Sequence, residues 1–310
     1  MSNDIKDKDK MSIMITGANG FTGKHACDYF KNAGYKVIAI TRNTSNLISD
    51  HNISYEHCEL TNKNSVYSLI NKIKPDYLLH LAGQNQVQHS WSDPILSIEA
   101  NTMSTAYLID ALRVINPTCK IIVVGSALQF NPNDISSLIH PYSLSKTLQS
   151  LIAQSWEQLY KMDIIIAKPS NLIGPGNSNG ICSILAKKVI DMEINNSEKL
   201  LELNNLYAKR DFVDVRDAVA AYETLFLQGV SGEIYDICTG ESKYLKDLTD
   251  TLYLLSGIDF KIKYIQNTPE TTEETFPSLL KNLGWNPLIP FETSIQTILA
   301  YFREQNHKTT

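Results

Sequence analysis

A glycine-rich turn near the N-terminus constrains the fold of this chain more than any other feature. The apolar run Ile13–Thr16 has the pattern of a buried strand, and a helical pattern begins at Lys24. Three glycines lie between them at the spacing G-x-x-G-x-x-G, where a tight turn and a closely approaching pyrophosphate would each exclude a side chain. The helix that follows directs its first amides and its dipole at an anion. We therefore predict a dinucleotide site here, the alternative being a glycine-bearing turn that binds no ligand. The expected cofactor contacts in this turn are Gly17, Asn19, Gly20, Phe21 and Gly23.

The first two-thirds of the chain alternates apolar runs with helical patterns, which predicts β-α units and a parallel sheet. The expected strands are Ser12–Thr16, Lys36–Thr41, Tyr77–Leu81, Lys120–Val124 and Asp163–Lys168. The expected helices are Lys24–Ala33, Asn64–Lys72, Ile98–Ile115 and Ser143–Tyr160. The predicted fold class is α/β, a Rossmann-type doubly wound parallel sheet with a smaller, mixed α/β C-terminal substrate lobe.

The last third of the chain has shorter and more mixed patterns. The segments expected there are the helices 181–191, 217–226, 245–256 and 295–305, the strands 210–215 and 234–236, and a loop over 269–277. We expect residues 1–10, which are polar, to be disordered. The NAD(P)-binding domain is predicted over 11–178, with 212–240 returning to it, and the substrate-binding lobe over 179–211 and 241–310.

The end of the second strand bears on the choice of cofactor. An NAD-binding unit usually places an acidic residue there for the ribose 2′-hydroxyl. Here the strand ends Ile40-Thr41-Arg42-Asn43, and Arg42 is a permanently charged phosphate ligand. This favours NADP(H), with NAD(H) as the alternative and an ordinary surface arginine as the competing interpretation. Further cofactor contacts are expected where the third and fourth strands end, at Glu59, Leu60, Leu81, Ala82 and Gly83.

A candidate catalytic group follows in Tyr142-Ser143-Leu144-Ser145-Lys146, where tyrosine and lysine are four residues apart and share a helix face. A lysine beside a phenol favours the phenolate and lowers its pKa, so the tyrosine can act as a general acid or base. Ser126 ends the preceding strand and could hold a substrate oxygen beside Tyr142. A solvated helix face and a strand-end turn residue are the simpler interpretations of these positions.

The chain resembles the extended short-chain dehydrogenases/reductases of the NAD-dependent epimerase/dehydratase family. The resemblance rests on four motifs in the family's order: Thr16–Gly23, His80–Gly83, Ser126 and Tyr142–Lys146. The similarity continues through 168–176 and 210–217, and it is greatest to GDP-6-deoxy-4-keto-mannose reductases. The resemblance implies a catalytic triad of Ser126, Tyr142 and Lys146, with Lys146 also binding the cofactor. It further implies roles for four other groups of residues: Asn101 stabilises the active-site helix, Pro169 shapes the nicotinamide pocket, Gln84 contacts the sugar, and Asn171 and Arg210 hold the substrate diphosphate.

The two residues after the catalytic hydroxyl bear on the type of reaction. Dehydratases of this family carry an Asp-Glu pair there, because removal of water needs an extra acid and base. This chain has Ala127 and Leu128, which cannot transfer a proton. Together with Arg42, this favours an NADP(H)-dependent 4-keto reductase, with hydride delivered to C4 of a nucleotide-linked 4-keto-6-deoxy sugar. A 4-epimerase with tightly bound NAD is the alternative, and an NADP-binding sensor without turnover ranks below it.

Two departures from the family concern the sugar pocket. The segment between Phe130 and Tyr142 is shorter than is usual, and Phe130 replaces a tyrosine. With these two departures, the expected substrate can carry a sugar or a nucleotide other than those of the GDP-mannose series.

Composition narrows the classes of partner. The net charge of -5 gives no footprint for nucleic acid, and no apolar run is long enough for a membrane helix. The five cysteines form no C-x-x-C pair, which favours reduced thiols and a cytoplasmic enzyme, and the histidines are not spaced as metal ligands. The family resemblance implies a homodimer joined through the helices 98–115 and 143–160.

Overall fold

The computed structural model describes residues 11–43, 52–195, 197–266, 268–269 and 274–307. The predicted tail over 1–10 and part of the predicted loop 269–277 lie outside these residues. The chain divides into two compact units. The first is formed by the chain up to Lys168 together with Val219–Tyr235, and the second by Pro169–Ala218 together with Asp236–Thr310.

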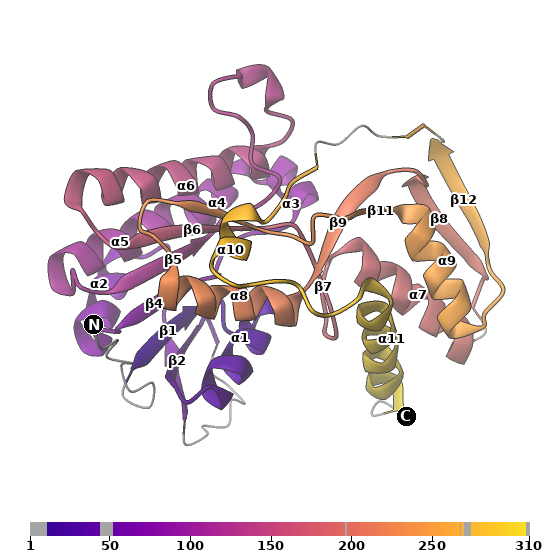
Figure 1. The fold of residues 1–310 in the computed structure, drawn as a ribbon, viewed down its shortest axis with the longest axis horizontal. Coiled ribbons are helices and arrows are strands. Elements are labelled where there is room, and N and C mark those ends of the chain that lie inside the picture. Colours follow the sequence, from indigo (N-terminus) through magenta and orange to yellow (C-terminus); the bar gives the residue numbers. More distant parts are fainter. Residues whose placement is uncertain (1–10, 44–51, 196, 267, 270–273, 308–310) are drawn as a thin grey trace. The chain divides into compact units, whose positions relative to one another are not determined.

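A seven-stranded sheet with the order β10-β6-β5-β4-β1-β2-β3 is the centre of the first unit (Figure 1). Its strands are β1 (Ser12–Thr16), β2 (Lys36–Thr41), β3 (Ile53–His57), β4 (Tyr77–His80), β5 (Lys120–Val124), β6 (Ile164–Pro169) and β10 (Ile234–Ile237). The pairs from β3 through β6 are all parallel. The strand order reverses between β1 and β4, and open sheets of this kind bind ligands outside the carboxyl ends of the strands at such a point.

Helices cover both faces of this sheet, which confirms the predicted α/β class. They are α1 (Phe21–Asn32), α2 (Lys63–Ile73), α3 (Val87–Ser92), α4 (Pro94–Ile98), α5 (Ser104–Ile115), α6 (Pro141–Tyr160) and α8 (Val215–Gln228). On one face α2, α5 and α6 pack over a cluster that includes Met14, Leu78 and Ile121. On the other, Phe226 of α8 packs against Phe30 of α1 and Tyr77 of β4, with ring centroids 6.1 and 4.7 Å apart.

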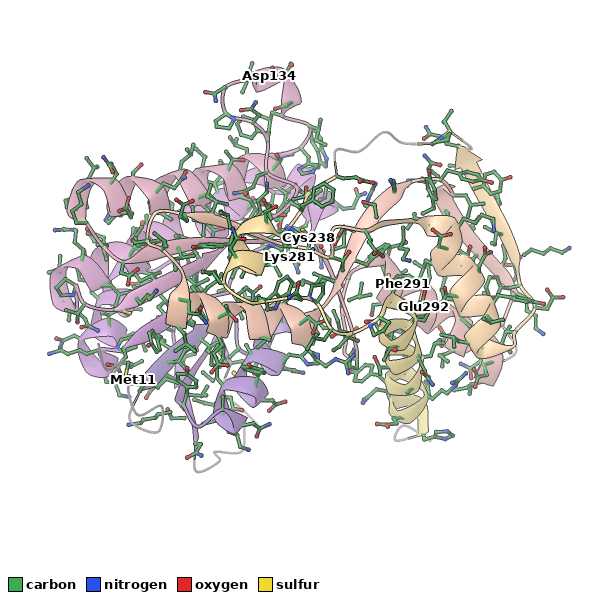
Figure 2. All side chains as sticks on the ribbon, in the orientation of Figure 1. Met11, Asp134, Cys238, Lys281, Phe291 and Glu292 are labelled. Carbon is green, nitrogen blue, oxygen red and sulfur yellow. The ribbon has the colours of Figure 1, made fainter. Side chains whose placement is uncertain are left out.

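The predicted helix Ile98–Ile115 differs from the structure, because a π-helical turn, Glu99–Met103, separates α4 from α5. Such turns insert one extra residue and recur at functional sites. Here the turn carries the Asn101 side chain, which is fully buried. The loop between β5 and α6 contains a short 3-10 turn, Ile135–Ser137, and Asp134 lies at its projecting tip (Figure 2).

The second unit contains two small sheets and four helices within the described residues. The strands are β7 (Asn171–Ile173), β8 (Leu200–Asn205), β9 (Lys209–Asp214), β11 (Ser242–Tyr244) and β12 (Lys261–Gln266). The helices are α7 (Ile181–Asn195), α9 (Leu245–Ser256), α10 (Ser278–Asn282) and α11 (Phe291–His307). One apolar cluster joins α7, α9 and α11 to β8 and β9.

Two carboxylates tie the C-terminal segment into the second unit. Asp214 is buried, accepts a hydrogen bond from Ser294 Oγ at 2.6 Å and pairs with Arg216 at 2.7 Å. Asp217 accepts hydrogen bonds from the amides of Leu288 and Ile289 at 3.0 and 2.9 Å. These contacts give Asp214 and Asp217 a structural role. Among the described helices, none combines the length and the apolar character that crossing a bilayer would require.

Candidate active site

The glycine turn between β1 and α1 has the geometry of an anion cradle. Gly17 has a φ of +68°, and a Cβ there would lie 2.9 Å from the Ala82 amide nitrogen. A Cβ on Gly23 would lie 2.1 Å from the Gly17 carbonyl oxygen. Among the described residues no side chain caps α1, which begins after Gly20, so its first amides are available to an anion. The turn therefore fits the pyrophosphate of a dinucleotide.

The other predicted cofactor residues lie at the carboxyl ends of β2, β3 and β4. Arg42 follows β2 and is exposed, and residues 44–51, after Asn43, lie outside the described chain. The Glu59 carboxylate accepts hydrogen bonds from the Thr61 amide and hydroxyl at 3.3 and 3.0 Å, and Leu60 is buried. Leu81, Ala82 and Gly83 follow β4, at the reversal of strand order.

Ser126 and Tyr142 meet in the first unit, because β5 ends just before Ser126 and α6 starts at Pro141. Tyr142 is buried, and burial raises the pKa of its phenol, while the hydrogen bond with the Ser126 side chain lowers it to a smaller extent. The Ser126 hydroxyl oxygen also accepts a hydrogen bond from the Leu128 amide at 3.1 Å. Tyr142 is therefore held as a neutral phenol beside a hydroxyl.

Lys146 lies one helical turn after Tyr142 and is 7% exposed. Its Nζ donates to the Val124 carbonyl oxygen at 2.6 Å and to Gln149 Oε1. Burial lowers the pKa of Lys146 to about 7. The predicted lowering of the Tyr142 pKa toward neutrality is wrong for this arrangement, because burial outweighs the other influences on the phenol and the net shift is upward.

The start of α6 is fixed by groups that the sequence interpretation did not include. His140 is the N-cap, and its Nδ1 accepts a hydrogen bond from the Ser143 amide at 2.9 Å. The Tyr142 amide donates to Ser90 Oγ at 3.1 Å. His140 precedes a proline at the first helical position, which is a recognisable helix-start signal. The pairing with Ser90, 52 residues away, leaves no local signal.

Asn101 lies beside the start of α6, and Gln84 is hydrogen-bonded to Asn101. Asn101 Nδ2 donates to Ser145 Oγ at 2.9 Å, and Ser145 Oγ donates in turn to the Tyr142 carbonyl at 2.9 Å. Gln84 Nε2 donates to the Gln86 carbonyl at 2.8 Å. Gln84 Oε1 is buried and has no hydrogen-bond partner among the described residues, so it can accept a hydrogen bond from a substrate hydroxyl.

The remaining predicted substrate residues belong to the second unit. Asn171 of β7 pairs with Phe212 of β9, and its Nδ2 donates to the Asp211 carbonyl at 3.0 Å. Arg210 precedes Asp211 on β9, and its Nη1 donates to the Lys209 carbonyl at 2.7 Å. Asn171 and Arg210 are thus brought to neighbouring strands. Pro169 is the last residue of β6.

A comparison with known protein families identifies the family of this chain. The model of the NAD dependent epimerase/dehydratase family matches residues 13–238. The chain belongs to this family. Its members are NAD(P)-dependent reductases, dehydratases and epimerases of sugar nucleotides.

Individual relatives match nearly the whole length of this chain. GDP-6-deoxy-D-mannose reductase of Pseudomonas aeruginosa is 25% identical over 93% of this chain and 96% of its own. The human dTDP-D-glucose 4,6-dehydratase is 24% identical over 95% of this chain and 91% of its own.

Solved structures agree on the fold. The structure of RMD from Pseudomonas aeruginosa complexed with NADPH has a TM-score of 0.81 and 23% identity, covering 95% of this chain and 98% of that one. A UDP-glucose 4-epimerase from Thermotoga maritima, solved with UDP-glucose, has a TM-score of 0.82 and 21% identity, covering 96% and 100%. Both have the same Rossmann-type architecture.

Proposed function

We propose that this protein is an NADPH-dependent reductase of a nucleotide-linked 4-keto-6-deoxy sugar. The observation that carries the proposal is the buried, neutral Tyr142 phenol, hydrogen-bonded to Ser126. Reduction of a ketone consumes one proton at the carbonyl oxygen, and a phenol with a raised pKa is protonated at neutral pH and can donate it. The Pseudomonas aeruginosa relative, a GDP-6-deoxy-D-mannose reductase, supports the same direction of chemistry.

In the proposed reaction each residue has a separate task. NADPH, when bound, supplies the hydride that forms the new C–H bond at C4. The Tyr142 phenol gives its proton to the C4 oxygen, and the Ser126 hydroxyl orients that oxygen. Lys146 supplies positive charge one helical turn from Tyr142, which stabilises the phenolate left after proton transfer.

Dehydration is disfavoured by the residues that follow Ser126. Ala127 and Leu128 carry no titratable group, whereas elimination of water needs a further acid and base at the substrate. Net reduction requires only the single proton donor that the site supplies. The proposal therefore does not extend to this chain the 4,6-dehydratase activity named for the human relative.

The choice of NADPH over NADH rests on Arg42. It stands exposed after β2, where an acidic residue would contact a ribose 2′-hydroxyl in an NAD enzyme. A guanidinium binds phosphate through paired N–H donors, so it suits the 2′-phosphate of NADPH. In the same proposal, Gln84 binds a sugar hydroxyl, and Asn171 and Arg210 bind the substrate diphosphate.

The test is oxidation of NADPH, followed by absorbance, with freshly prepared GDP-, UDP- and dTDP-linked 4-keto-6-deoxy sugars. Stoichiometric loss of NADPH with one of them is the expected result and names the nucleotide. A change of sugar stereochemistry without net oxidation would assign a 4-epimerase instead. If NADPH binds but is not oxidised and no sugar changes its stereochemistry, the protein is an NADP-binding protein without turnover.

We also propose that the protein acts as a homodimer through α5 and α6. Apolar side chains on these helices are exposed, including Val114 at 57% and Leu159 at 69%. Water-exposed apolar side chains grouped on adjacent helices are typical of an interface between copies.

A further inference from the structure

Gln149 is a fully buried polar side chain one helical turn after Lys146. Both the oxygen and the nitrogen of its amide form hydrogen bonds. Gln149 Oε1 accepts a hydrogen bond from Lys146 Nζ. Gln149 Nε2 donates to Thr105 Oγ1 of α5 at 2.9 Å. A buried amide with two partners is fixed in place, because rotation would leave polar groups unpaired.

The hydrogen bonds around Thr105 fix the direction of each donor. Thr105 Oγ1 lies 2.7 Å from the Asn101 carbonyl, to which its one proton must go. It therefore accepts from Gln149 Nε2 and also from His80 Nε2, which is 2.8 Å away. Because Thr105 needs the nitrogen of Gln149, the oxygen of that amide faces Lys146.

The same chain of bonds reaches the cofactor turn. His80 lies at the end of β4 with its Nε2 protonated, so its Nδ1 accepts from Thr16 Oγ1 at 2.7 Å. Thr16 Oγ1 accepts in turn from the Ala82 amide at 3.1 Å. Burial, followed by the nearby charge of Lys146, lowers the pKa of His80 to about 3, which keeps the ring neutral in this role.

We propose that Gln149 is a positioning residue, which holds the Lys146 ammonium through its amide oxygen and anchors it on Thr105 and His80. The inference rests on the proposed function, in which Lys146 supplies charge beside Tyr142. Burial alone would release the lysine proton. An amide oxygen that accepts from Nζ opposes this, because it stabilises the charged form and cannot donate to a neutral amine.

The test is titration of Lys146 in the full-length protein by NMR of ε-carbon-13 lysine, with the resonance identified by its loss in Lys146→Met. Among the described residues, the charge of Lys146 acts on His80 of β4, and Tyr142 lies one turn earlier on the same helix. In Gln149→Glu we expect the midpoint to rise by about 1–3 pH units, since a carboxylate favours the ammonium. In Gln149→Met, which preserves bulk, we expect it to fall by about one unit.

Two further variants separate positioning from general disturbance of the helix. Gln158→Met makes the same change at an exposed position of α6 and should leave the Lys146 midpoint unchanged. Thr105→Val should lower the Lys146 midpoint, as Gln149→Met does. Thr105→Ser, which keeps the hydroxyl, should keep the midpoint of wild type. Equal midpoints in wild type, Gln149→Glu and Gln149→Met, with melting temperatures showing folded proteins, would overturn the inference. The titration uses neither cofactor nor substrate, so its failure is distinguishable from failure of the proposed reductase activity.

Discussion

The Asn101 side chain binds both backbone polar groups of Gln84. The Gln84 amide donates to Asn101 Oδ1 at 2.8 Å, and Asn101 Nδ2 donates to the Gln84 carbonyl at 3.0 Å. This pairing fixes the segment after β4, where a Cβ on Gly83 would lie 2.4 Å from Asn101 Oδ1. Asn101→Asp should therefore destabilise the protein by about 1–3 kcal/mol, because a carboxylate cannot donate to the Gln84 carbonyl or to Ser145. Urea unfolding measures this loss.

The matched control is Asn64→Asp on α2, whose side chain is exposed. We expect its free energy of unfolding to stay within about 0.5 kcal/mol of wild type. An Asn101→Asp protein as stable as this control would mean that the Asn101–Gln84 pairing does not contribute to folding.

The cofactor turn could be predicted from sequence because its glycines are individually required. Gly17 has a positive φ, and Gly23 leaves no room for a Cβ, so their spacing reports the backbone directly. Strand β3 is harder to predict: Ile53 is its one buried residue, and Ser54–His57 are partly or fully exposed at the edge of the sheet. The parallel pair β8 and β12 depends on residues about 60 positions apart.

The candidate site shows the same limit. The Tyr-x-x-x-Lys spacing correctly predicts that Tyr142 and Lys146 share α6, since a helix repeats every 3.6 residues. The spacing does not determine where the lysine nitrogen points. That depends on Gln149 and on the Val124 carbonyl of β5, a partner 22 residues away.

Removal of the proposed proton donor should separate chemistry from binding. Tyr142→Phe keeps the ring and removes the hydroxyl, so turnover should fall about 10²- to 10⁴-fold. The dissociation constant for NADPH, measured by fluorescence titration, should change little. Retention of full turnover would exclude Tyr142 as the general acid.

Arg42 should determine the preference between the two cofactors. Arg42→Ala removes a charge-assisted phosphate contact, so the dissociation constant for NADPH should rise about ten- to hundredfold while that for NADH changes little. Arg303→Ala is the control, because Arg303 pairs with Glu193 in the second unit at 2.8 Å. An equal loss of affinity for both cofactors would argue against 2′-phosphate recognition.

Stability should depend on pH through buried histidines. Burial lowers the pKa of His80 to about 3 and also lowers the pKa of His140, from a reference value of 6.5. Below about pH 6.5 the unfolded chain therefore binds protons that the folded protein does not, and the free energy of unfolding should decrease as pH falls. It should be unaffected by these two groups above that pH.

His140→Asn tests the part due to the helix cap. Asparagine is a good N-cap and does not titrate, so the loss of stability between pH 6.5 and 5 should become shallower than in wild type. Urea unfolding at several pH values measures the slope, and His89→Asn, at an exposed position, is the control. An unchanged slope would indicate that His140 does not act as a neutral cap.

The proposed dimer can be tested on the exposed apolar positions of α5 and α6. Val114 and Leu151 are 57% and 39% exposed, and a glutamate at each would place charge in the proposed interface. Wild type should show twice the chain mass of 34.8 kDa by light scattering, and the double variant Val114→Glu, Leu151→Glu should show the single mass. Leu254→Glu on α9 makes the same change at an apolar side chain that is 80% exposed and should leave the dimer intact. A dimer that persists in the double variant would place the contact elsewhere on the chain, because desolvating two unpaired carboxylates per copy costs more than the interface could offset.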